Sequence, residues 1–129
     1  MMRLHHIGVA CRDISGEIAS LSRIHEVVEC TPIRFDKAQN AELALLTLKD
    51  GTRIELIGGP AVDTLLKRNI TYYHLCFEVA DIDSEIDRLT IEGAKLLSPP
   101  TPAVLFGGRR VAFLHVSYGI IELLSQNDG

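Results

Sequence analysis

The sequence predicts an α+β fold in which one βαβββ unit occurs twice. Three observations lead to this prediction: two histidine-led stretches repeat each other, a helical stripe of aliphatic residues follows each of them, and each copy ends on a strand that carries a glutamate. Residues 6–14 are HIGVACRDI and residues 74–82 are HLCFEVADI. The same spacing separates Glu17 from Glu85. Internal similarity at a fixed spacing indicates a duplicated supersecondary unit.

Each repeat is predicted to open with a strand and to continue into a helix. The strands cover residues 4–10 and 72–79, and an aspartate suited to capping a helix follows each one. The helices are indicated by aliphatic side chains spaced i, i+4 and i+7, which form one stripe that must pack on a sheet. These side chains are Ile14, Ile18 and Leu21 in the first repeat and Ile82, Ile86 and Leu89 in the second.

The first helix is predicted to end between Ile24 and Glu29, and the second at Gly93. Three strands then follow in each repeat. The predicted strands are residues 27–33, 41–49 and 52–57 in the first repeat, and 95–97, 110–116 and 119–124 in the second. Asp50 and Gly51 have the composition of a hairpin turn.

Two segments of the second repeat are unsuited to a central strand. Residues 98–102 are rich in proline and residues 106–108 end in two glycines, so both are expected to form a loop over one end of the sheet. A short helix is predicted at residues 62–68. The whole chain, residues 1–129, is expected to be a single domain with a first module at about 1–58, a linker at about 59–70 and a second module at about 71–129.

Composition excludes several classes of protein. A formal net charge of −4 at pH 7, spread along the chain, argues against a nucleic-acid partner. The longest apolar run, residues 43–48, is too short to span a membrane. No charged leader precedes an apolar stretch, so the expected location is the cytoplasm. Three cysteines without CxxC spacing indicate a reduced protein without disulfides.

Two histidines and two glutamates are the candidate metal ligands. His6 and His74 lie at matching positions on the opening strands, and Glu55 and Glu122 lie between aliphatic residues on the closing strands. Taken singly, each is more often a core or solvent-facing residue than a ligand. The duplication, however, puts both ligand types at equivalent places in both copies. A carboxylate inside an apolar strand is costly unless it is paired, solvated or bound to a metal.

We therefore expect one divalent ion held by all four side chains. Two nitrogen and two oxygen donors without a thiolate favour Co, Ni, Mn, Zn or Fe. Four protein ligands that leave positions open for substrate indicate a catalytic site.

The same residues resemble the vicinal oxygen chelate superfamily, and most closely its methylmalonyl-CoA epimerases. The stretches that carry the resemblance are residues 4–10, 53–56, 73–82, 107–115 and 121–124. The resemblance implies two βαβββ modules that form a partly open barrel-like sheet around a metal cleft, and a divalent ion held by His6, Glu55, His74 and Glu122. Two features depart from the epimerases. The epimerases usually carry glutamine where this chain has Glu55, whereas bacterial glyoxalase I carries glutamate. The first helix also lacks the Phe-Tyr and Leu-Gly signature that is frequent in both subfamilies.

Glu42 is a second candidate for a catalytic carboxylate. It lies one strand before Glu55 and matches a position where the epimerases resemble each other in carrying a catalytic glutamate. A solvent-facing residue on a half-exposed strand is an equally good interpretation. Near the metal, such a carboxylate would exchange a proton with a carbon acid.

The function we expect is a metal-dependent epimerase of a 2-substituted acyl-CoA thioester, with Glu42 and Glu122 as the candidate bases. Two alternatives stay open: a glyoxalase I that acts on a glutathione hemithioacetal, which Glu55 favours, and a non-catalytic small-molecule binding or resistance protein. A ring-opening dioxygenase is less compatible with four matched ligands. Exposed strand edges and the resemblance favour a homodimer.

Several other polar residues are weaker candidates. Cys76 shares a face with His74 and is expected to be inert packing. His5, His25 and His115 lack repeat partners and are not expected to be ligands. Arg109, Arg110, Lys67 and Arg68 could contact the phosphates of a CoA-type substrate, although ordinary surface charge is the simpler interpretation.

Overall fold

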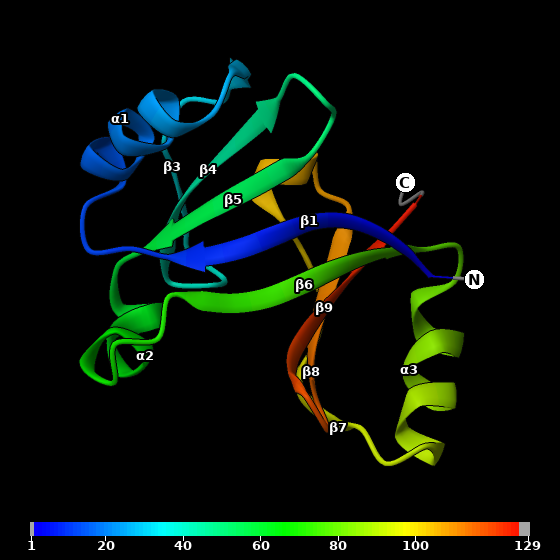
Figure 1. Ribbon diagram of the computed structural model, residues 1–129. Coiled ribbons are helices and arrows are strands. Elements are labelled where there is room, and N and C mark those ends of the chain that lie inside the picture. The colour runs from blue at the N-terminus through cyan, green and yellow to red at the C-terminus, as the bar shows by residue number, and fades with distance from the viewer. Residues whose placement is uncertain (1, 127–129) are drawn as a thin grey trace. The chain divides into compact units, whose positions relative to one another are not determined.

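The computed structural model describes residues 2–126, and its contacts divide the chain into two compact units (Figure 1). One unit is His6–Tyr73, and the other combines the chain on either side of it, up to His5 and from His74 onward. The chain thus passes between the units twice, between His5 and His6 and between Tyr73 and His74. Because of these crossings, each of the two histidines predicted as ligands begins a segment of its unit.

The unit His6–Tyr73 contains most of the first repeat. Its elements are β1 (Arg3–Ala10), α1 (Ile14–Ile24), β2 (Val27–Cys30), β3 (Arg34–Asp36), β4 (Ala41–Leu48), β5 (Arg53–Gly58), the 3-10 helix η1 (Pro60–Val62) and α2 (Asp63–Lys67). The strands are hydrogen-bonded in the order β2-β4-β5-β1, and β3 also pairs with β4. β1 and β5, the first and last strands of the repeat, run parallel, whereas β4 is antiparallel to β5.

The other unit contains the second repeat. Its elements are β6 (Tyr72–Val79), α3 (Ile82–Ile91), β7 (Lys95–Pro102), the 3-10 helix η2 (Val104–Phe106), β8 (Arg110–Val116) and β9 (Gly119–Ser125). The strand order is β6-β9-β8-β7, with β6 and β9 parallel. The opening residues of β1 also belong here, and Arg3 Nη2 donates a hydrogen bond to Glu78 Oε1 of β6 at 3.3 Å. The α+β class and the repeated βαβββ order are confirmed, while a metal cleft and a single domain stay predictions.

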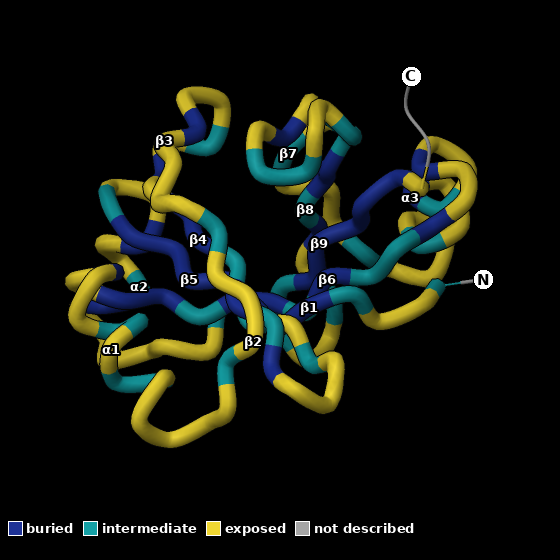
Figure 2. The backbone as a smooth tube through the Cα atoms, turned by 90° about the horizontal axis from the view of Figure 1, so that it is seen from above, coloured by how far each residue is buried: buried dark blue, intermediate teal, exposed yellow. Residues whose placement is uncertain are grey.

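The aliphatic stripe of each helix packs on its own sheet, as the spacing predicted. Ile14 of α1 is buried with Ala44, Leu46 and Leu56, and Ile18 and Leu21 pack against this cluster. The second stripe is equivalent: its Ile82 and Ile86 are buried in the cluster of Ala112, Leu114, Ile121 and Leu123. Figure 2 shows buried residues along β4, β5 and β9, whereas many residues of α1 are exposed.

Strand alternation gives each sheet a second face, turned away from its helix. In β5, Ile54 and Leu56 pack in the cluster beneath α1, so Glu55 and Ile57 lie on the opposite face. In β9, Ile121 and Leu123 pack beneath α3, so Glu122 lies on the opposite face. This face of the second unit is closed by a separate apolar cluster of Cys76, Ala103, Val111 and Leu124.

The prediction of a loop at residues 98–102 is wrong. These residues continue β7, which runs to Pro102 and pairs with β8. The register shifts between Leu96 and Ser98 and again between Ser98 and Thr101. β7 is the last strand in the order, and an edge strand tolerates prolines because one side of its backbone has no strand to bond. Residues 104–106 form the turn of η2, and Gly107 has a positive φ of 65°.

The first repeat also differs in one segment from the prediction. A single strand was expected over residues 27–33, whereas β2 ends at Cys30 and a separate strand, β3, begins at Arg34. Pro32 lies in the gap and has no N–H to donate to a ladder. The predictions for the helices are confirmed. α1 ends at Ile24, and α2 lies within residues 62–68. Gly93, which has a φ of 104°, follows the end of α3.

Within the described range, none of the helices has the length and apolarity needed to cross a lipid bilayer.

The packing of α3 on its sheet makes a prediction about stability. Ile121→Ala should lower the free energy of unfolding by about 2–5 kcal/mol, because Ile121 is fully buried and its truncation leaves a cavity. Ile91→Ala is the matched control: Ile91 is 84% exposed, so the change should be within about 0.5 kcal/mol. Urea unfolding followed by circular dichroism measures both. Equal effects of the two substitutions would contradict this packing.

Candidate metal centre

The first unit brings together two of the four predicted ligands, His6 and Glu55. Glu55 of β5 lies in register with Gly8 of β1, two residues after His6, so that His6 and Glu55 share a face. Glycine at position 8 has no side chain to separate them. His6 Nε2 lies 3.3 Å from Glu55 Oε1, and both residues are 1% exposed. The pair faces away from α1.

The second unit repeats this arrangement with the other two ligands. Glu122 of β9 lies in register with Cys76 of β6, again two residues after the histidine. His74 Nε2 is 3.0 Å from Glu122 Oε1, and both side chains are 1% exposed. The ring of His74 also packs edge-on against Phe113, with centroids 5.3 Å apart, which restricts its orientation. The predicted equivalence of the two copies therefore holds at the level of strand register.

The donor chemistry of the two pairs fits a divalent metal ion. Each pair offers one imidazole nitrogen and one carboxylate oxygen, both removed from solvent. Burying a carboxylate costs free energy that a neighbouring imidazole offsets only in part, and a cation offsets more fully. Nitrogen and oxygen donors together suit borderline ions such as Co, Ni, Mn, Zn and Fe.

Glu42 lies on the other face of the first unit. It is exposed on β4 and pairs with Gly58, whereas the residue that pairs with Glu55 is Leu45. Alternation therefore puts Glu42 on the side of Ala44 and Leu46, which pack beneath α1. The pKa of the Cys11 thiol is consistent with this position of Glu42. Burial raises the pKa of Cys11 to about 11, and the negative charges of Glu17, Asp13 and Glu42 raise it further. The structure does not bring Glu42 together with the His6–Glu55 pair.

Arg109 is held by the second unit itself. Its Nε donates a hydrogen bond to the carbonyl of Ser125 at 2.7 Å, and its Nη2 donates to Glu78 Oε2. Glu78 also accepts from Arg3, so that one carboxylate joins two guanidinium groups. Glu78 belongs to β6, two residues after Cys76, on the face that carries His74. Sequence reasoning missed it, because a glutamate at the end of a strand has many ordinary surface roles.

The charges around Glu78 shift its titration. Burial by itself raises the pKa of Glu78, but the hydrogen bond and charge of Arg109, with His5 and Arg3 adding to them, bring that pKa below its ordinary value. The carboxylate is thus held in its charged form near the donor face.

Comparisons with known proteins give a consistent result. A family model described as the Glyoxalase/Bleomycin resistance protein/Dioxygenase superfamily matches residues 5–113. The chain is 28% identical over 119 residues to an ethylmalonyl-CoA/methylmalonyl-CoA epimerase of Cereibacter sphaeroides, covering 88% of this chain and 87% of the relative.

Solved structures show the same fold. Methylmalonyl-CoA epimerase from Mycobacterium tuberculosis superposes with a TM-score of 0.83 at 21% identity, covering 98% of this chain and 89% of that one. A variant of the Streptomyces coelicolor methylmalonyl-CoA epimerase in complex with 2-nitronate-propionyl-CoA has a TM-score of 0.74 at 24% identity, covering 97% and 94%. At these identities the likeness concerns the fold.

The lowered pKa of Glu78 makes a prediction about acid stability. A carboxylate whose pKa is lowered on folding stabilises the protein fully above its unfolded value of 4.5, and this contribution disappears as the pH falls through the folded value. Glu78→Gln should therefore destabilise the chain at neutral pH, and the difference from the parent should shrink below pH 4.5. Chemical unfolding at a series of pH values measures it, with the exposed Glu92→Gln as control. A difference that is independent of pH would contradict the assignment.

Proposed function

Because this chain belongs to the Glyoxalase/Bleomycin resistance protein/Dioxygenase superfamily, we propose that it is a metal-dependent epimerase. It would act on a 2-substituted acyl-CoA thioester, by removing and returning the proton next to the carbonyl. The observation that carries the proposal is the pair of equivalent, buried His–Glu contacts, His6 with Glu55 and His74 with Glu122. The epimerase relative and the epimerase folds support the substrate class.

In this proposal the two pairs form one site and hold one divalent ion. Chain connectivity supports this. His6 directly follows His5, a residue of the unit that contains His74 and Glu122, and His74 directly follows Tyr73 of the unit that contains His6 and Glu55. Successive Cα atoms are about 3.8 Å apart, so each histidine lies at a point where the chain crosses between units. Two crossings so placed favour a shared site over two separate ones.

The bound ion would supply Lewis-acid polarisation of the substrate carbonyl and electrostatic stabilisation of the enolate. The residues of the chain would do the rest. His6 and His74 would hold the ion through Nε2, since this nitrogen of each faces the paired carboxylate. The apolar surroundings of Glu122, with Leu124 and Phe113 close by, would exclude water from the reacting carbon.

Glu122 is the base that we propose for removing the proton. Its carboxylate is buried on the donor face and has two oxygens, so that one can face the cation while the other accepts the proton. The same group, once protonated, can return the proton. Inversion further requires a donor on the opposite side of the enolate. Glu42 is the remaining candidate from the sequence, and its place on the α1 side makes it the weaker of the two.

A glyoxalase I is the second candidate, and one observation favours it. Position 55 carries a glutamate, as in bacterial glyoxalase I, rather than the glutamine usual in epimerases. Both reactions begin by removing a proton next to a carbonyl, so the same donor set could serve either. They differ in substrate: a glutathione hemithioacetal for the lyase and a CoA thioester for the epimerase.

A second copy of the chain, forming a homodimer, is the protein partner that we propose.

The first prediction from this proposal concerns metal content. The purified chain should hold about one divalent ion per molecule. His6→Ala and His74→Ala should each lower this metal content strongly, because each substitution removes an imidazole ligand. The aliphatic stripes that support the fold are untouched, so circular dichroism should stay unchanged. Elemental analysis after gel filtration measures the metal. His115→Ala, at an exposed histidine, is the matched control. Unaltered metal content in either ligand variant would show that the histidine is misassigned.

The second prediction compares the two paired glutamates. With a 2-methyl-branched acyl-CoA in deuterated water, the parent should wash deuterium into the position next to the carbonyl. Glu122→Gln should slow this exchange roughly a hundred- to ten-thousand-fold, the usual contribution of a positioned base. Glu55→Gln should retain metal and exchange, because an amide oxygen can replace a ligand carboxylate oxygen. Mass spectrometry of the recovered thioester provides the rates.

The outcomes separate the candidate functions. No exchange with any acyl-CoA, together with conversion of a glutathione hemithioacetal, would establish the lyase instead. Binding without either reaction would indicate a small-molecule binding protein. Glu42→Gln should leave exchange within about threefold of the parent, since its side chain lies on the α1 face. A loss as large as that of Glu122→Gln would assign Glu42 a catalytic role.

A further inference from the structure

Phe113 of β8 lies beside the glutamate of the second His–Glu pair. The antiparallel pairing of β8 with β9 puts Phe113 directly opposite Glu122. Residues paired in this way share a face of the sheet, and their Cβ atoms are about 4.5–5.5 Å apart. On its other side, Glu122 lies in register with Cys76 of β6. The carboxylate proposed as the base therefore has a neighbouring side chain on each side along the sheet.

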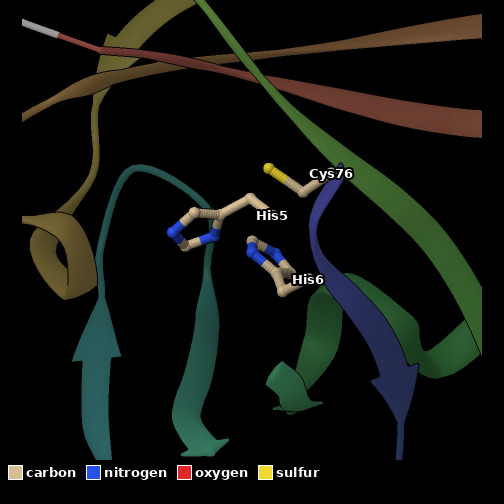
Figure 3. A group of neighbouring side chains, drawn as sticks. All are labelled: His5, His6 and Cys76. Carbon is tan, nitrogen blue, oxygen red and sulfur yellow. The ribbon is translucent and has the colours of Figure 1, made fainter. Parts of the chain in front are cut away.

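These two neighbours differ in their access to a substrate. Cys76 is fully buried, and its Sγ lies within 4.8 Å of a ring nitrogen of His5, with both side chains shown in Figure 3. Phe113 packs against the apolar cluster that closes this face of the second unit, but it is only half-buried. Because β8 is bonded on both sides, by β7 and β9, the exposed part of Phe113 belongs largely to its ring. Phe113 therefore offers apolar surface beside the Glu122 carboxylate.

The position of Phe113 is restricted by contacts in its own unit. Its ring packs edge-on against that of His74, with centroids 5.3 Å apart. Its backbone N–H donates a hydrogen bond to Ser98 Oγ of β7 at 3.3 Å, and the register of β7 shifts on both sides of Ser98. Register shifts of this kind are common beside functional sites, where they redirect a side chain. A ring held in this way has little freedom to move aside for a larger group, which is what discrimination by size requires.

In the proposed epimerisation, the carbon that gives up its proton to Glu122 also carries the carbonyl and the 2-substituent. A base acts within about 2.6–3.2 Å of the group whose proton it removes, so the substituent also comes close to the carboxylate and its neighbour. We propose that Phe113 contacts the 2-substituent and selects thioesters in which this group is a short, uncharged alkyl chain. An apolar ring beside a carboxylate disfavours a charged group at that place. This role rests on the proposed function, because Phe113 would act on the substrate of that reaction.

Deuterium exchange with two thioesters tests this role. A 2-propyl acyl-CoA is longer than a 2-methyl acyl-CoA at the substituent, so the parent should exchange the 2-methyl substrate faster. Phe113→Leu should raise the ratio of kcat/KM for 2-propyl over 2-methyl at least about tenfold, because loss of the ring makes room for the longer chain. Phe77→Leu is the matched control, since Phe77 is half-buried in the same unit but packs beneath α3. Its ratio should equal that of the parent, and both variants should keep the metal content of the parent.

A measurement on the unaltered chain decides the matter even if a variant misfolds. In the Zn²⁺-loaded protein, the isotopically labelled methyl group of a bound 2-methyl acyl-CoA should give a proton signal shifted upfield, because the ring current of a phenyl face shields nearby protons. No upfield shift, or the same substrate ratio in Phe113→Leu as in Phe77→Leu, would overturn the role of Phe113 and leave the proposed epimerase standing. A parent that exchanges neither thioester would overturn both.

Discussion

Parallel pairing between the first and last strands of each repeat is the constraint on which the site depends. In both units, this pairing sets the glutamate opposite the residue two positions after the histidine, Gly8 for Glu55 and Cys76 for Glu122. A slip of one residue would turn each glutamate toward the helix. What prevents the slip is the aliphatic neighbours of the glutamates, which pack beneath α1 and α3. The apolar cores therefore fix the donor geometry from the opposite face of each sheet.

Buried His–Glu pairs contribute little to stability by themselves. Desolvating two polar groups costs about as much as their mutual attraction returns, and apolar residues of similar volume would often stabilise the fold more. The chain nevertheless buries such a pair in each of its two repeats, at equivalent positions of the register. A stabilising role does not account for this repetition. The proposed metal site, which uses two nitrogen and two oxygen donors, would account for it.

Periodicity in the sequence was sufficient to predict the elements that have a repeated pattern. The Ile14 and Ile82 stripes and the His–Glu pairs follow from local alternation together with the duplication. The strand through Pro99 and Pro100 was missed because its tolerance of proline depends on β7 lying at the edge, which is a property of the sheet order. The start of β3 at Arg34 was missed for a related reason: its pairing with β4 is not visible in three residues of sequence.

Side chains whose role depends on strand register were also hard to predict. Glu42 and Glu55 lie on neighbouring strands, and only the pairing of Leu45 with Glu55 shows that the two carboxylates face opposite ways. Arg109 is separated from Glu78 by 31 residues, and no local pattern connects them. The sequence therefore predicted the two His–Glu pairs, which occur in both repeats, better than the polar residues that occur once.

Substrate specificity must come from residues outside the donor set. An epimerase and a glyoxalase I both generate an enolate next to a carbonyl, so the groups that would stabilise it are the same in either reaction. The same fold serves several such chemistries, and the tail of the substrate distinguishes them. The hydrogen bonds of Arg109 argue against its contacting a CoA phosphate, because Arg109 would have to give up a charge-assisted hydrogen bond to Glu78 and a second bond to the Ser125 carbonyl. In the proposed function the two His–Glu pairs would serve either reaction, so the choice between a CoA and a glutathione tail would fall to side chains outside these pairs.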